Sequence, residues 1–62
     1  MTYQERMRAI LERDPFPLEE ARAMSQILHD AGEMGIGLDP IEEEIWGKLI
    51  LEILRHTPKA IL

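Results

Sequence analysis

Two clusters of helix-breaking residues divide this 62-residue chain into three segments, and no other feature constrains its fold as strongly. The first cluster is Asp14-Pro15-Phe16-Pro17, where each proline disfavours the α conformation of the residue before it. The second is Gly35-Ile36-Gly37, whose glycines are able to take the left-handed conformation that ends many helices. We therefore expect three short elements joined by two connections.

The segments between these clusters begin with the signals of helix starts. Thr2 with Glu5 three residues later has the pattern of a capping box, and Asp39 with Glu42 repeats it. Pro17 suits the first turn of a helix, where a missing N–H costs nothing. Valine and asparagine are absent, whereas eight leucines and nine glutamates favour helix over strand. The sequence predicts a single all-α domain over residues 1–62, with helices at about residues 3–13, 17–34 and 40–56.

The second and third predicted helices are apolar over wide faces. At about 100° per residue, the apolar residues of the second helix cover roughly 220° of its circumference, and those of the third cover about 180°. The first helix has an apolar stripe of only about 100°, enough to contact one neighbour. A single copy of the chain therefore leaves apolar surface uncovered, and such patches usually mark an interface.

The short connection between the second and third helices predicts an antiparallel hairpin. Two such hairpins from two copies would form a four-helix core and bury the excess apolar surface of a domain that is small for one core. We therefore expect a homodimer. The side chains predicted at its interface are Met24, Trp46, Ile50, Leu54, Ile61 and Leu62.

The charge distribution argues against a nucleic-acid partner. The chain has a net charge of −5, and residues 18–47 carry Arg22 alone against eight acidic side chains. Phosphate binding depends on lysine and arginine. A helix-turn-helix made from the second and third helices would present Glu42, Glu43 and Glu44 to the nucleic-acid backbone. We expect no binding to nucleic acid.

The ionisable and nucleophilic residues do not match a known catalytic or metal site. The chain has no cysteine, and its one serine is Ser25. His29 with Glu33 and His56 with Glu52 are spaced to share a helix face. Each is only a pair, whereas zinc and di-iron sites need three or four ligands. We expect no enzyme activity, no cofactor and no metal.

No segment resembles a membrane span or a secretion signal. Apolar runs such as Leu49-Ile50-Leu51 are far shorter than the ~20 residues that a membrane-spanning helix needs. The N-terminal residues lack the basic and apolar regions of a signal peptide. We expect a cytoplasmic protein without a membrane partner.

Three classes of function remain open. The sequence favours a small, non-catalytic interaction or regulatory protein that acts as a homodimer and binds another protein. The first alternative is an accessory subunit of a larger complex, whose apolar surface meets a different chain. The second is a ligand-binding or enzymatic oligomer. Its pocket would lie at the dimer interface, lined by Met24, Met34 and Trp46 and edged by Arg22 or His29.

Overall fold

The computed structural model describes residues 2–58, and this part of the chain consists of three α-helices and their connections. The helices are α1 (Tyr3–Glu12), α2 (Leu18–Glu33) and α3 (Pro40–His56). The prediction of an all-helical fold with three helices is confirmed, and no predicted boundary differs from the observed one by more than one residue. None of the described helices has both the length and the apolar character that crossing a membrane requires.

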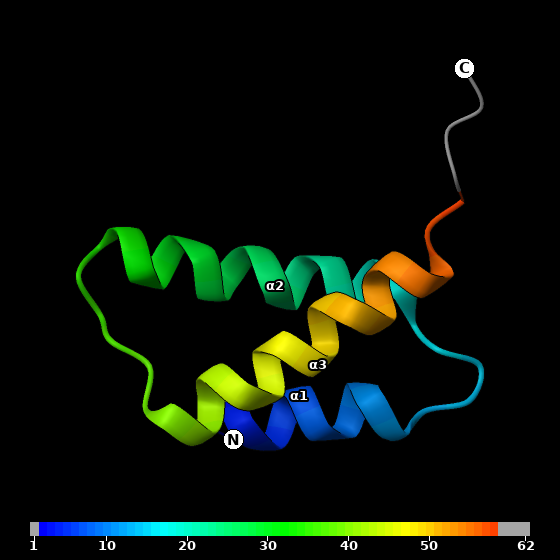
Figure 1. The fold of residues 1–62 in the computed structure, drawn as a ribbon, viewed down its shortest axis with the longest axis horizontal. Helices are drawn as coiled ribbons and strands as arrows, with labels where there is room; N and C mark the ends of the chain where they lie inside the picture. The colour runs from blue at the N-terminus through cyan, green and yellow to red at the C-terminus, as the bar shows by residue number, and fades with distance from the viewer. Residues whose placement is uncertain (1, 59–62) are drawn as a thin grey trace.

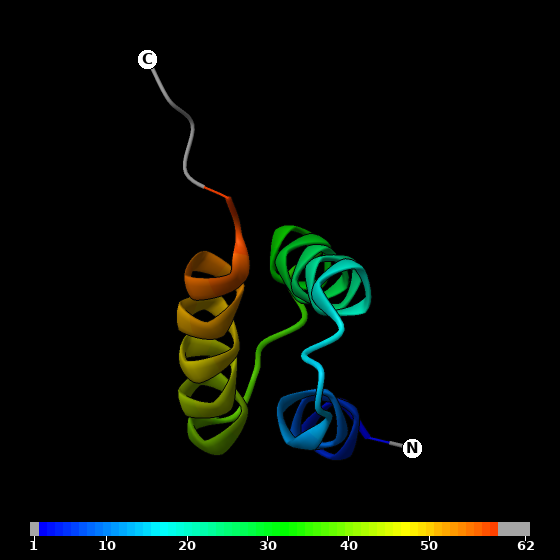
Figure 2. The same ribbon diagram turned by 90° about the vertical axis from the view of Figure 1, so that its right-hand side faces the viewer.

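The helices form two layers. α1 and α2 lie in one layer, and α3 lies alone in the other and crosses both of them obliquely (Figure 1, Figure 2). The start of α3 is beside α1, and its end is beside α2. In Figure 1, α2 runs from right to left and α3 returns from left to right at a slant. The antiparallel hairpin and the dimeric four-helix core stay predictions.

Hydrogen-bonded caps explain where α1 and α3 begin. Asp39 Oδ1 accepts from the backbone N–H of Glu42 at 2.8 Å, and Glu42 Oε1 accepts from that of Asp39 at 3.2 Å, so the predicted box of α3 is complete. At α1, Thr2 Oγ1 accepts from the backbone N–H of Glu5 at 3.2 Å, but the Glu5 carboxylate accepts from the Thr2 hydroxyl. α2 begins after Pro17 with no side-chain cap.

The end of α2 has the geometry that its glycines predict. Gly35 has a φ of 83°, in the left-handed region where a side chain is strained. The backbone N–H of Gly35 donates to Gly32 O at 3.1 Å, and that of Ile36 donates to Ala31 O at 2.9 Å. This pair of bonds is a Schellman motif, which satisfies the last carbonyl groups of the helix.

The core lies between the two layers and receives side chains from all three helices. Met7, Met24, Leu28 and Leu49 are the largest fully buried side chains. No polar or charged residue within residues 2–58 is buried, so the core depends on apolar packing alone. The buried cluster consists of Met7, Ile10, Ala21, Met24, Leu28, Ile45 and Leu49.

Candidate interaction surface

One face of α3 is apolar and exposed. Ile50, Leu51 and Leu54 are 39%, 62% and 64% exposed. Together with Gly47 they lie within an arc of about 100° around the helix. We call these four residues the outer stripe. It lies on the side of α3 roughly opposite the buried Leu49, so α1 and α2 leave it uncovered.

Trp46 lies at the border between the core and the outer stripe. The ring is half-buried and packs against the core cluster. Its Nε1–H donates to Ser25 Oγ on α2 at 3.0 Å. This bond gives the indole N–H a partner where packing against the core reduces its contact with water. Ser25 therefore ties α2 to α3 through a hydrogen bond between side chains.

A groove between α2 and α3 runs beside the outer stripe. Its α3 wall is apolar and its α2 wall is polar. It brings together Trp46, Arg22 and His29, three of the residues that we expected around an interface pocket. Met24 and Met34 are not part of it. The residues that line the groove are Arg22, Ser25, Gln26, His29, Trp46, Ile50 and Ile53.

The polar groups along this groove already have partners within the chain. Arg22 donates to Thr57 Oγ1 at 3.2 Å and lies 3.7 Å from a carboxylate oxygen of Glu19. The Nε2 atom of His29 lies 3.8 Å from Glu33 Oε1. Within residues 2–58, no group of three or more His, Cys, Asp or Glu side chains is arranged to hold a metal ion. Arg22 and His29 are thus both engaged with side chains of the same chain.

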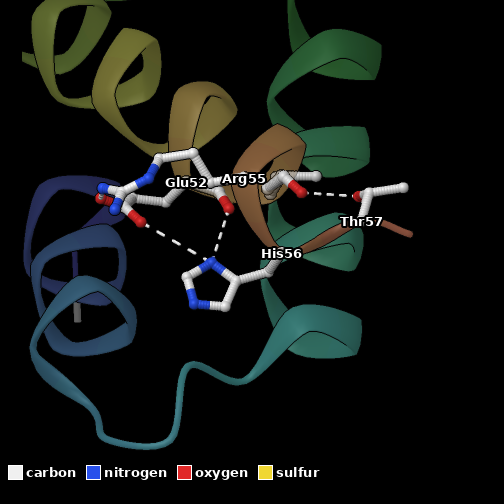
Figure 3. Close-up of polar contacts among 5 residues, drawn as sticks. Glu52, Arg55, His56 and Thr57 are labelled. Atoms are coloured by element: carbon white, nitrogen blue, oxygen red, sulfur yellow. Dashed lines mark hydrogen bonds and ion pairs between the residues drawn. The ribbon is translucent and has the colours of Figure 1, made fainter. Parts of the chain in front are cut away.

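The end of α3 is attached to the rest of the fold through its last turn. The His56 ring stacks on Phe16, with a distance of 4.6 Å between the ring centroids. His56 Nδ1 lies 2.9 Å from the backbone oxygen of Glu52 and 3.7 Å from its carboxylate, as Figure 3 shows. Thr57 Oγ1 donates to Ile53 O at 2.6 Å. The stacking on Phe16 holds the C-terminal end of α3 against the α1–α2 connection, and the hydrogen bond from Arg22 to Thr57 connects this end to α2.

The charges of α3 are separated along its length. Glu42, Glu43 and Glu44 follow its first residues, whereas Arg55 and His56 occupy its last turn. Arg55 forms an ion pair with Glu52 at 3.0 Å and keeps 73% of its side chain exposed. Acidic residues near a helix start and basic residues near its end both favour the helix dipole. The helix thus has an acidic N-terminal end and a basic C-terminal end, and the outer stripe lies between them along its length.

The six predicted interface residues fall into different parts of the chain. Ile50 and Leu54 lie on the exposed outer stripe, and Trp46 is half-buried beside it. Met24 is only 1% exposed, so the chain's own core covers it. Ile61 and Leu62 lie outside the described residues. Leu51 and Gly47 also lie on the outer stripe but are not among the six predicted interface residues. Their spacing from Ile50 and Leu54 places all four on one helix face, and this spacing is visible in the sequence.

Comparisons with known proteins gave no match: no protein-family model, curated protein or solved structure is significantly similar to this chain.

Proposed function

We propose that this chain is a small, non-catalytic helical interaction protein that acts as a homodimer and binds another protein. The observation that carries the proposal is the outer stripe, a contiguous apolar surface of α3 that the other described residues of the chain leave exposed. Leu51 and Leu54 each keep more than half of their surface exposed. Covering apolar surface with another chain contributes roughly 25 cal/mol per Å² of buried area.

A second copy of the chain is the occupant that size and charge favour. A domain of about 60 residues buries only ~60% of the surface of its unfolded chain, so association adds substantially to its burial. The acidic start and basic end of α3 allow two copies related by a twofold axis to place opposite charges together. The α2 and α3 helices of both copies, paired as antiparallel hairpins, would then form the predicted four-helix core.

The surface for a second protein lies at the connection between α2 and α3. Met34, Ile36 and Ile41 are 77%, 51% and 53% exposed there. Residues 23–47 contain six acidic side chains and no lysine or arginine. The partner segment proposed for this end combines basic with apolar side chains, because complementary charge favours the encounter and excludes acidic competitors.

The two alternative functions, an accessory subunit and a ligand-binding or enzymatic oligomer, would use different surfaces of the chain. An accessory subunit would use the outer stripe against a different chain and would remain monomeric by itself. A ligand-binding oligomer would use the groove where Trp46 lies near Arg22 and His29. The oligomeric state of the isolated chain separates the first alternative from the homodimer.

Solution mass by light scattering over a wide concentration range tests the proposal. The wild-type chain should approach twice its 7.2 kDa at high concentration. Leu54→Gln should stay near the monomer mass at the same concentrations, because it places an amide on the outer stripe. Ile41→Gln is the matched control, since Ile41 is similarly exposed on α3 but off the stripe. A wild-type chain that stays monomeric throughout would contradict the homodimer and favour the accessory subunit.

A further inference from the structure

Gly47 is a residue that the fold of one copy does not require. It lies in the interior of the 17-residue helix α3, where glycine destabilises a helix relative to alanine. Apart from its chain neighbours and the nearby backbone of α3, a Cβ atom placed on Gly47 would meet no heavy atom of the described residues within 4 Å. Its φ is not positive either, unlike that of Gly35. Within residues 2–58 of a single copy, neither close packing nor backbone conformation accounts for this glycine.

The position of Gly47 on the outer stripe indicates where a partner would come close. A glycine on an exposed apolar face leaves a depression that a larger side chain of another helix is able to fill. Leu54 lies seven residues further along the same face, about 10 Å away along the axis. The midpoint between Gly47 and Leu54 falls between Ile50 and Leu51. A twofold axis at that midpoint would bring Gly47 of each copy opposite Leu54 of the other.

The charges of α3 favour an antiparallel over a parallel pair. In a parallel pair, Glu43 of one copy would lie beside Glu43 of the other, and like charges would repel. In an antiparallel pair, this acidic end lies beside the partner's Arg55. The antiparallel arrangement also brings opposite ends of the two helix dipoles together.

The layer arrangement leaves room for such a pair. α3 forms a layer of its own, with α1 and α2 together on one side (Figure 2). The outer stripe is exposed on the remaining side. On one flank of the stripe, Ile50 borders the groove that Arg22 and His29 of α2 also line. A second α3 seated on the stripe would therefore also come close to α2.

We infer that two copies of this chain associate through an antiparallel pair of α3 helices, with the twofold axis between Ile50 and Leu51 and with Gly47 of each copy facing Leu54 of the other. This inference rests on the proposed homodimer and adds its orientation and register. It places the two α3 helices at the centre of the dimer.

Single-cysteine variants of the full chain test the orientation, because the sequence has no cysteine of its own. A disulfide requires Cα atoms within about 7 Å. Leu51→Cys lies next to the proposed axis and should form a disulfide-linked homodimer on oxidation. In the proposed dimer, the two copies of residue 44 are about 20 Å apart along the helix axis, and the two copies of residue 55 are about 14 Å apart. Neither Glu44→Cys nor Arg55→Cys should therefore form a disulfide-linked homodimer alone. All three positions are exposed, and circular dichroism verifies that each variant is folded.

A mixture of Glu44→Cys and Arg55→Cys provides the positive control for the off-axis positions. These two residues lie on the same flank of the stripe and would be offset by only about 3 Å along the axis. The mixture should give a linked heterodimer that neither variant gives alone. A homodimeric disulfide in Glu44→Cys or Arg55→Cys alone would contradict the proposed register. Linkage of Leu51→Cys without a heterodimer in the mixture would indicate a parallel pair and overturn the inference, because residues on the same flank then lie on opposite sides of the interface.

Two further outcomes separate this inference from the homodimer itself. A dimeric mass without any disulfide at these positions would leave the homodimer standing and place its interface elsewhere. A monomeric mass would contradict both.

Gly47→Ala tests the close approach at the stripe. The added methyl group should weaken association about tenfold or more, because it fills the depression opposite Leu54. Dilution experiments by light scattering measure this change. Association as strong as in the wild-type chain would contradict the proposed register.

Discussion

The two faces of α3 contain similar side chains in opposite environments. Leu49 on the inner face is 0% exposed, whereas Leu54 on the outer stripe is 64% exposed. Both are leucines in the same helix, and each has an isoleucine nearby on its face, Ile45 on the inner and Ile50 on the outer. The comparison shows that burial of an apolar side chain is favourable, but that apolar character alone does not determine which neighbour buries it.

The difference between the faces follows from the placement of α1 and α2. Both helices lie on the same side of α3, so their apolar stripes converge on its inner face (Figure 2). Met7 from α1 and Met24 from α2 are buried there. No helix among the described residues reaches the outer side, so the outer stripe stays exposed within residues 2–58.

The largest effect should come from the inner face. Leu49→Ala should lower the free energy of unfolding by about 2–5 kcal/mol, because it leaves a cavity among fully buried side chains. A domain of this size has a total stability of roughly 3–9 kcal/mol, so the variant should lose a large share of it. Urea denaturation of dilute protein, followed by circular dichroism, measures the loss.

Leu54→Ala is the matched control for that measurement. It should change the stability of dilute, monomeric protein by less than about 0.5 kcal/mol, since the side chain is mostly in water already. Equal losses in the two leucine variants would break the distinction between the faces.

A smaller effect is expected at the border between the two faces. Ser25→Ala removes the acceptor of the Trp46 indole N–H and should cost about 0.5–1.5 kcal/mol. Because Trp46 is only half-buried, water is able to replace part of the lost hydrogen bond. Urea denaturation of Ser25→Ala, Trp46→Phe and the double variant measures the coupling. Additive losses would show that the hydrogen bond contributes nothing.

The smallest effect should have the opposite sign. Gly47→Ala should raise the stability of the dilute monomer by about 0.5–1 kcal/mol, because alanine favours the helix and meets no neighbour. The melting temperature of dilute protein reports this gain. A lower melting temperature would show that Gly47 is needed within one copy, and it would remove the basis for close approach by a partner.

The sequence by itself determined the helices and their ends. The capping box of Asp39 and Glu42 and the glycine cap at Gly35 act over three to five residues, so local chemistry is enough to predict them. The separation of charge along α3 is likewise visible in the order of its residues. These features explain why the predicted boundaries agree so closely with the observed ones.

Only the tertiary structure decided which apolar side chains are covered. Met24 and Leu54 both belong to wide apolar faces, yet the first is buried and the second is exposed, because burial depends on where the other two helices lie. Contacts between distant segments, such as Phe16 with His56 and Ser25 with Trp46, depend on the same placement. Helix starts and ends arise from interactions between near neighbours, whereas burial and these long-range contacts arise from the packing of whole helices.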